Sequence, residues 1–137
     1  VPTLAIYKIL SEGVGVLSDF MVERSLKVTN QQRDTFGRAR AKGVRIALGT
    51  DAGSPLFGPH PVAFKEMHMM NLYGMSKEEV VTSATLTAAE VLGMEHEIGS
   101  VEPGKLADLL VLETNPYEDL DAFTKHLVSV YKEGMLV

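Results

Sequence analysis

One acidic residue occupies a position where chemistry could be placed. Asp51 follows a short apolar run, Val44 to Leu48, and lies in a tight turn between Gly49 and Gly53. In barrels of alternating strands and helices, the carboxyl ends of the strands carry the active-site residues. A carboxylate there can bind a metal ion or take a proton from metal-bound water. Asp-x-Gly turns are also common where the acid only caps its own backbone, so both interpretations stay open.

Histidine supplies a second candidate. His60 lies in the proline- and glycine-rich loop after Asp51, where it can face the same site or be exposed. The other histidines form no His-x-His pair and no His-Glu-x-x-His motif with it. We expect His68 to pack in the core and both His96 and His126 to lie on the surface. The chain has no cysteine, which excludes disulfides and zinc-thiolate sites.

Two further polar residues lie near these candidates. Glu66, in a helix predicted over 62–72, shares a face with Met70 and points either toward the loop after Asp51 or into solvent. Thr50 either orients Asp51 through a hydrogen bond or ends the strand. The residue types do not decide between these alternatives.

The elements that must position these residues follow from apolar spacing and from breakers. Residues 1–10 predict the end of a strand running into a loop, and 19–26 have weakly helical spacing. Thr29 or Asn30 is a plausible cap for the helix that Gly43 ends. The run Val44 to Leu48 is then predicted to be a strand.

Two capping boxes predict the starts of two short helices. They pair Ser76 with Glu79 and Thr87 with Glu90, for helices over 77–84 and 88–92. Gly93 is expected to end the second helix.

The pattern then changes to turns and strands. Glu102 to Lys105 fits a type II turn, and a strand is predicted over 106–112. A short helix over 119–126 precedes a hairpin made of 128–131 and 135–137.

Composition limits the classes of partner. The chain has 137 residues and a net charge of −5, and its 13 basic residues form no run. This argues against nucleic acid or an anionic membrane as the main partner. No apolar run approaches the roughly 20 residues of a membrane span, so we expect a soluble, cytoplasmic protein.

Three stretches together resemble the carboxyl-terminal part of the amidohydrolase superfamily, in its imidazolonepropionase-like and prolidase-like branch. They are residues 43–53, 84–93 and 98–112, and the segment Val1-Pro2-Thr3-Leu4 resembles the end of the seventh barrel strand. The resemblance implies an α/β fold: the carboxyl-terminal portion of a (β/α)8 TIM-type metallohydrolase barrel, over residues 1–98, and part of a small β-sandwich, over 99–137.

The resemblance also implies an activity. In this family a metal-bound hydroxide attacks the carbonyl of a cyclic amide or a dipeptide, and an aspartate after the eighth strand binds the metal and shuttles the proton. That aspartate is Asp51 here, which makes it the catalytic residue and a ligand of a divalent metal, zinc. His60 matches a Pro-His motif that suggests a substrate contact, although Pro61 stands where relatives often carry glycine.

The family's other metal ligands have no counterpart in this chain, because their strands would precede Val1. We therefore expect a fragment of a metal-dependent hydrolase that is inactive and nearly metal-free by itself. Open strand edges would favour association into a homo-oligomer. The alternative is a non-catalytic assembly or binding module that kept the same elements for packing.

Overall fold

The computed structural model describes residues 1–13, 17–52 and 61–137. They fold into two compact units, Val1–Gly74 and Met75–Val137. The boundary predicted between residues 98 and 99 concerns the domains of the whole protein and stays a prediction. None of the helices within the described ranges is long and apolar enough to cross a membrane.

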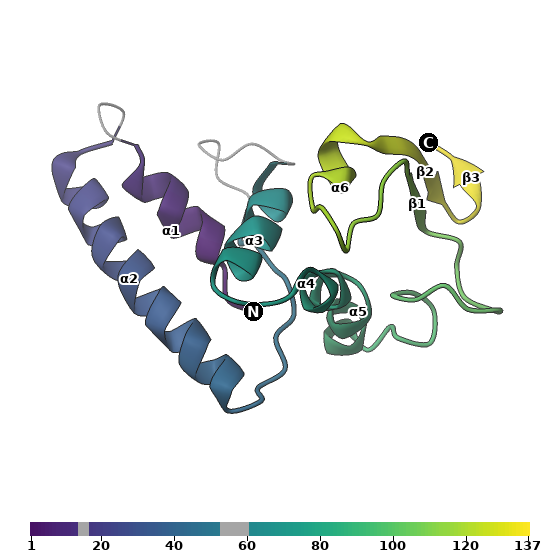
Figure 1. Cartoon of the computed structure of the whole chain (residues 1–137), viewed down its shortest axis with the longest axis horizontal. Helices are drawn as coiled ribbons and strands as arrows, with labels where there is room; N and C mark the ends of the chain where they lie inside the picture. Colours follow the sequence, from purple (N-terminus) through teal and green to yellow (C-terminus); the bar gives the residue numbers. More distant parts are fainter. Residues whose placement is uncertain (14–16, 53–60) are drawn as a thin grey trace. The chain divides into compact units, whose positions relative to one another are not determined.

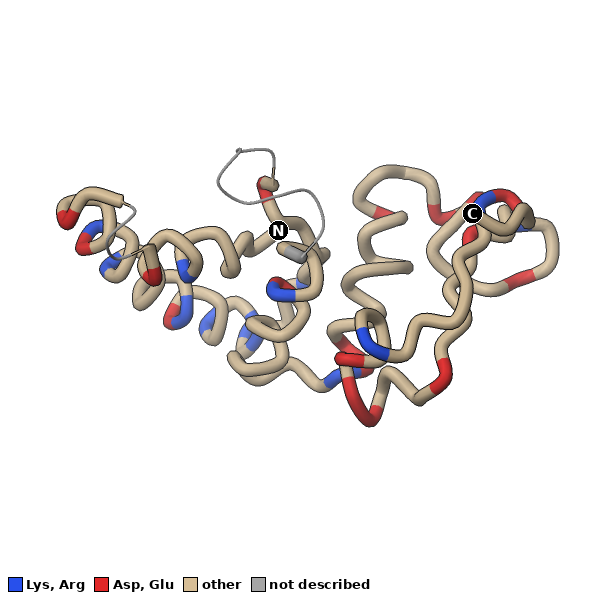
Figure 2. The backbone as a smooth tube through the Cα atoms, turned by 90° about the horizontal axis from the view of Figure 1, so that it is seen from above, with Lys and Arg blue, Asp and Glu red and all other residues tan. Residues whose placement is uncertain are grey.

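The first unit is helical. Helix α1 (Leu4–Ser11) packs against α2 (Asp19–Ala41) and α3 (Pro61–Leu72), as Figure 1 shows. All three helices and the extended segment after α2 contribute to its apolar core. The buried residues are Leu4, Ala5, Phe36, Ala47, Val62, Met67, Met69 and Met70. The exposed face of α2 carries both signs of charge, including a Lys27–Glu23 ion pair at 2.8 Å (Figure 2).

The start of this unit differs from the prediction. Residues 4–11 form a helix and not a strand end, because burial of Leu4 and Ala5 against the other helices outweighs local strand propensity. Helix α2 is continuous from Asp19 and is capped by Ser18, so the cap predicted at Thr29 or Asn30 is wrong. Thr29 instead donates its hydroxyl to the Ser25 carbonyl within the helix, at 2.9 Å.

The end of α2 confirms the prediction for Gly43. This glycine has φ +69°, and its N–H donates to the Arg40 carbonyl at 2.8 Å. The Val44 N–H reaches back to the Ala39 carbonyl at 3.1 Å. These bonds satisfy carbonyls that the helix end would otherwise leave unpaired.

The strand predicted over Val44 to Leu48 is not formed as a paired strand. Residues 44–52 belong to no helix or strand, although Ala47 is buried. A β-strand is completed by hydrogen bonds to a neighbour, and within the described ranges no strand lies beside this segment. The segment therefore has the sequence of a buried strand but belongs to no sheet in the part of the chain that the structure describes.

The second unit begins with two short helices, α4 (Lys77–Ala84) and α5 (Leu86–Leu92). The capping box of Ser76 and Glu79 is confirmed: each side chain accepts the other residue's backbone N–H, at 3.1 and 2.7 Å. The box predicted at Thr87 is wrong, because α5 begins at Leu86, two residues before the predicted start, and leaves Thr87 inside the helix. Gly93 ends α5 in the left-handed conformation, as predicted.

A three-stranded antiparallel sheet completes this unit, in the order β1 (Leu109–Leu112), β2 (Leu127–Lys132) and β3 (Met135–Leu136). The predicted hairpin is confirmed, while β1 is shorter than the predicted strand over 106–112. The short helix before the hairpin, α6 (Ala122–Lys125), is likewise shorter than predicted.

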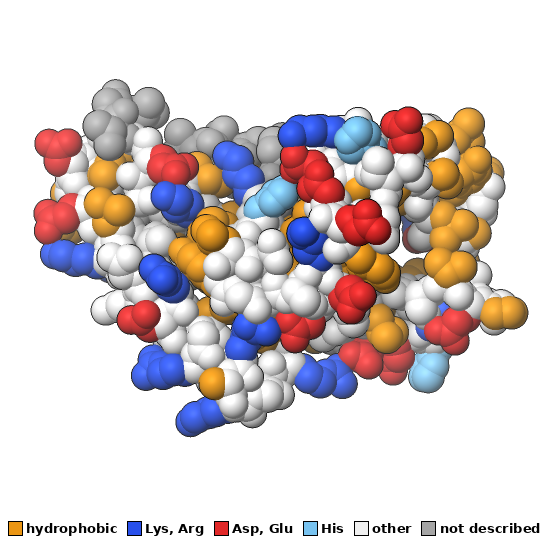
Figure 3. Space-filling model, viewed as in Figure 1, with side chains coloured by type: hydrophobic (Ala, Val, Ile, Leu, Met, Phe, Trp, Pro, Cys, Tyr) orange, Lys and Arg blue, Asp and Glu red, His pale blue; other side chains and the backbone are white. Residues whose placement is uncertain are grey.

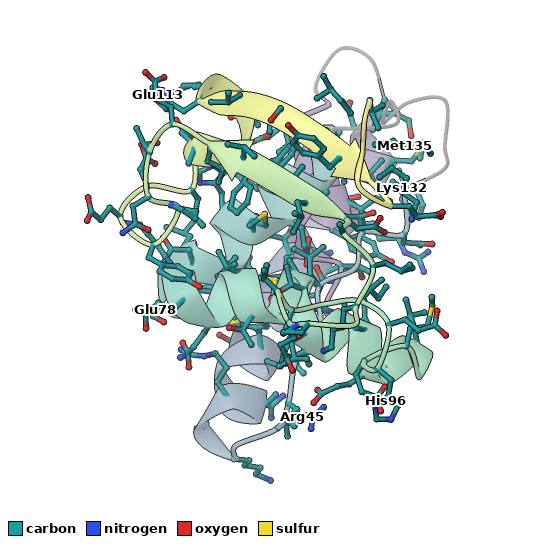
Figure 4. All side chains as sticks on the ribbon, turned by 90° about the vertical axis from the view of Figure 1, so that its right-hand side faces the viewer. Arg45, Glu78, His96, Glu113, Lys132 and Met135 are labelled. Carbon is teal, nitrogen blue, oxygen red and sulfur yellow. The ribbon has the colours of Figure 1, made fainter. Side chains whose placement is uncertain are left out.

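Asp108 fastens the hairpin turn to the start of β1. Its carboxylate accepts from Lys132 Nζ at 2.6 Å and from the Glu133 N–H at 2.8 Å. The hydrogen bond from Lys132 is the main cause that lowers the pKa of Asp108 below its ordinary value. Lys132 and Met135, on either side of this turn, are labelled in Figure 4. Within the stretch 98–112, which carries part of the resemblance, Asp108 therefore has a structural role.

Two glycines of this unit allow a matched test of packing. Gly99 (φ +94°) and Gly104 (φ +92°) have almost the same φ angle. A Cβ on Gly99 would lie 2.6 Å from the Ala89 Cβ and 3.1 Å from the Leu86 Cα, whereas one on Gly104 meets nothing within 4 Å. We expect Gly104→Ala to lower the free energy of unfolding by about 1 kcal/mol. Gly99→Ala should lower it by about 3 kcal/mol. Equal losses in urea denaturation would contradict this packing.

Candidate functional site

Two segments that belong to no helix or strand lie against each other in the first unit, at Val1 and Gly49. A Cβ placed on Gly49 would lie 2.4 Å from Val1 Cγ1, so Val1 occupies the space that a side chain at position 49 would need. Residues 1–4 are the stretch that the resemblance assigns to the end of the seventh strand, and Val44 to Leu48 is the predicted strand that precedes Asp51. The chain thus brings Val1 beside Gly49, the residue that follows this predicted strand.

Backbone strain marks both ends. Thr3 (φ 49°, ψ 48°) and Asp51 (φ 52°) lie in the left-handed region, which residues with a Cβ rarely adopt. The third such residue in the described ranges, Glu133, lies in the tight hairpin turn between β2 and β3, where this conformation is expected. Aspartate adopts this region more readily than most residues, so the strain is clearer at Thr3 than at Asp51. Strained residues often cluster at functional sites, which draws attention to the turn at Thr3.

Asp51 is exposed at the end of its segment. The Thr50 oxygen accepts the Ala52 N–H at 3.2 Å, so Thr50 shapes the turn around Asp51. His60 lies outside the described residues. Among the residues that the structure describes, no three histidine or acidic side chains gather into a metal site. A catalytic zinc needs about three protein ligands, so the single carboxylate present does not suffice to hold one.

Glu66 of α3 takes neither of the positions that the sequence left open. It is fully buried, and its carboxylate accepts the backbone N–H groups of Leu4 at 2.9 Å and Ala5 at 2.7 Å. Burial raises the pKa of Glu66 above its ordinary value, although the two N–H donors oppose the shift. The acid therefore caps α1 from a helix about 60 residues further along the chain.

Gln32 of α2 holds the same segment from another side. Its Nε2 donates to the carbonyl oxygens of Pro2 at 3.3 Å and Thr3 at 3.4 Å. The Gln32 Oε1 atom is buried and has no hydrogen-bond partner in the described part of the chain. Residues 2–5 are therefore held through their carbonyls by α2 and through their N–H groups by α3.

The remaining histidines contribute no cluster. His68 is exposed on α3, so its predicted place in the core is wrong. His96 is on the surface as predicted, and His126 lies 3.5 Å from the Glu113 carboxylate at the edge of the sheet.

The spacing of residues around Glu66 indicates that this acid is buried. Val62, Glu66 and Met70 are spaced four residues apart and therefore share one helical face. Val62 and Met70 are almost completely buried. An acid between two buried apolar residues on one face is expected to be buried as well, with a hydrogen-bond partner.

The raised pKa of Glu66 predicts a pH effect on stability. The fold favours the protonated acid, so the free energy of unfolding falls as pH rises from 4.5, the ordinary value, through the raised pKa. Glu66→Gln should remove this fall, and urea denaturation from pH 4 to 7 would measure it. Asp108, Glu102 and Glu23 have lowered pKa values, which make the free energy of unfolding rise with pH. This contribution is the same in the wild type and in Glu66→Gln. A pH-independent difference between wild type and variant would contradict the prediction.

Comparison with known proteins identifies the family. The model of the amidohydrolase family matches residues 3–137. The chain belongs to the amidohydrolase family. Imidazolonepropionase of Clostridium tetani is 33% identical over 136 residues, covering 92% of this amidohydrolase chain and 32% of that protein. The 5-methylthioadenosine/S-adenosylhomocysteine deaminase of Symbiobacterium thermophilum is 38% identical over 90 residues, covering 59% and 20% respectively.

Solved structures agree with this assignment. The crystal structure of a Xaa-Pro dipeptidase with bound methionine superposes with a TM-score of 0.85 and 34% identity, covering 100% of this amidohydrolase chain and 34% of that one. The chain thus spans about a third of the length of the Clostridium relative and of this structural neighbour. These relatives support a hydrolytic family that acts on C–N bonds.

Proposed function

We propose that this chain is the carboxyl-terminal part of a metal-dependent amidohydrolase that hydrolyses a C–N bond in a cyclic amide or a dipeptide. Family membership and the names of the relatives support the reaction class. The observation that carries the proposal is the place of Asp51 just after a strand-like segment, two residues beyond Gly49, which lies against Val1 of the second segment. A (β/α)8 barrel over 1–98 and part of a sandwich over 99–137 are the architecture that this function implies.

In this proposal the residues have separate roles. Asp51 provides one metal ligand and holds the proton taken from the attacking water. A divalent metal, which we expect to be zinc, supplies the activated water when bound. His60 contacts the substrate. Because Asp51 alone cannot hold zinc, the other ligands belong to residues outside this chain, and the chain alone should be inactive.

The reading frame upstream of Val1 tests this proposal. A His-x-His pair within a few hundred residues before Val1 would support it, because that pair is the metal motif expected after the first barrel strand. A frame that carries no such pair would contradict the hydrolase and favour the alternative.

The alternative is a non-catalytic assembly or binding module, which the exposed apolar surface favours. Apolar side chains gather over β2 and β3 in Figure 3. Those exposed by more than 60% in this region are Val128, Met135, Leu136 and Val137. Such surfaces usually mark an interface.

This surface predicts association in either case. We expect the purified chain to form a homo-oligomer, because the exposed apolar side chains of the hairpin would be covered by another copy. Multi-angle light scattering measures the mass directly. A well-behaved monomer of 14.9 kDa at tens of micromolar would contradict this expectation.

A further inference from the structure

One buried acid has no part in the chemistry proposed above. Glu66 is completely buried, between Val62 and Met70 on the inner face of α3. An isolated carboxylate in such surroundings is costly unless it is hydrogen-bonded. Its two bonds, to the Leu4 and Ala5 N–H groups, both reach the first turn of α1. The contact therefore joins α3 to the chain next to Thr3.

These bonds replace the usual cap of α1. A threonine before a helix normally has an extended backbone, and its side-chain oxygen accepts an N–H of the first turn. Thr3 instead has a left-handed backbone and makes no side-chain cap bond. The Glu66 carboxylate accepts the Leu4 and Ala5 N–H groups instead of the Thr3 side chain. The fold therefore tolerates the left-handed backbone of Thr3.

The segment around Thr3 is also held by α2 and by Gly49. Gln32 of α2 donates to the Pro2 and Thr3 carbonyls. Val1, two residues before Thr3, fills the space over Gly49. Strain of this kind persists only where the surroundings fix it, and here contacts from α2, α3 and Gly49 do so.

We propose that Glu66 is a positioning residue: it holds the turn at Thr3 in its left-handed conformation at the candidate site, beside the segment that ends in Asp51. The relevance of this turn to hydrolysis rests on the proposed function, whereas the contact itself does not. A purely structural role would mean that Glu66 stabilises α1 without determining the conformation of Thr3.

The test compares two variants of the 137-residue chain by NMR. Glu66→Gln keeps the size of the side chain but turns an N–H₂ group toward one of the two donors. Val62→Ala, on the same buried face of α3, removes packing and no hydrogen bond. We expect Glu66→Gln to shift the Thr3 Cα and Cβ resonances from left-handed to extended values. The contact between the Val1 methyl groups and Gly49 should be lost too.

Val62→Ala should destabilise the unit but leave both signals in place. The proposal is overturned if Glu66→Gln leaves the Thr3 resonances unchanged, or if Val62→Ala moves them equally.

A measurement on the wild-type chain covers the case in which Glu66→Gln does not fold. The Leu4 and Ala5 amides should exchange with solvent at least about 100-fold more slowly than those of Asp19 and Phe20, which begin α2 and have no such acceptor among the described residues. Equal exchange rates would overturn the proposal. Neither measurement needs metal or substrate. If the hydrolase assignment failed, these signals would be unchanged, so its failure can be told apart from a failure of this proposal.

Discussion

Asp51→Asn is expected to lower the rate of hydrolysis by roughly 10³-fold in the protein expressed from the complete reading frame that contains this chain. Asparagine keeps the size of the side chain but cannot take a proton, and it is a weaker metal ligand than a carboxylate. The measurement is kcat/KM with a Xaa-Pro dipeptide, which the name of one structural neighbour suggests, and with a cyclic amide, the other class in the proposed function. Most of the loss should be in kcat, because the proton is transferred during the chemical step.

Asp34→Asn serves as the matched control for this variant. Asp34 is an exposed acid in the middle of α2, and the same change of charge there should leave kcat/KM unaltered. If Asp51→Asn retained wild-type rates while the unmodified protein hydrolysed these substrates, Asp51 would have no catalytic role and the hydrolase would use another acid.

Glu66→Ala is expected to lower the free energy of unfolding by about 4 kcal/mol, since each buried N–H left without an acceptor costs about 1–3 kcal/mol. The variant leaves two such groups, on Leu4 and Ala5, and a cavity between α1 and α3. Relief from burying the carboxylate offsets part of the loss. Urea denaturation monitored by circular dichroism would measure the change in midpoint.

Glu78→Ala provides the comparison for Glu66. Glu78 is exposed in the first turn of α4 and is labelled at the surface in Figure 4. Its removal should cost less than about 1 kcal/mol, from the helix dipole alone. A loss for Glu66→Ala no larger than that for Glu78→Ala would show that the two hydrogen bonds add little to stability.

Features set by neighbouring residues were predictable from the sequence. The capping box at Ser76, the helix ends at Gly43 and Gly93 and the hairpin turn at Glu133 are all determined within a few residues. In these cases local backbone geometry requires a particular residue type. The similar box pattern at Thr87 and Glu90 was nevertheless wrong, so a local pattern is not always sufficient.

Features that depend on distant contacts were not predictable in the same way. The first residues have an apolar, strand-like composition, yet α1 forms because it buries Leu4 against other helices and receives its cap from Glu66. The strand predicted at Val44 to Leu48 failed for a related reason, because pairing needs a second strand. Tertiary partners, which a local pattern does not contain, decided both outcomes.

The candidate site was predicted in part. The place of Asp51 at the end of an apolar segment followed from the sequence, whereas the strained backbone of Thr3 and its supports, Gln32 and Glu66, did not. Threonine has no intrinsic preference for the left-handed region, so no pattern around Thr3 indicates it. Only the contact between Val1 and Gly49 relates residues 1–5 to the segment that precedes Asp51.

Elemental analysis tests the central claim most directly, because the claim is that Asp51 is one of several metal ligands. The protein from the complete reading frame should carry at least one divalent ion per chain, and Asp51→Asn should carry clearly less. The 137-residue chain alone should carry far less than one ion, since a single carboxylate does not retain zinc. A full complement of metal in Asp51→Asn, or stoichiometric zinc in the isolated chain, would contradict the account.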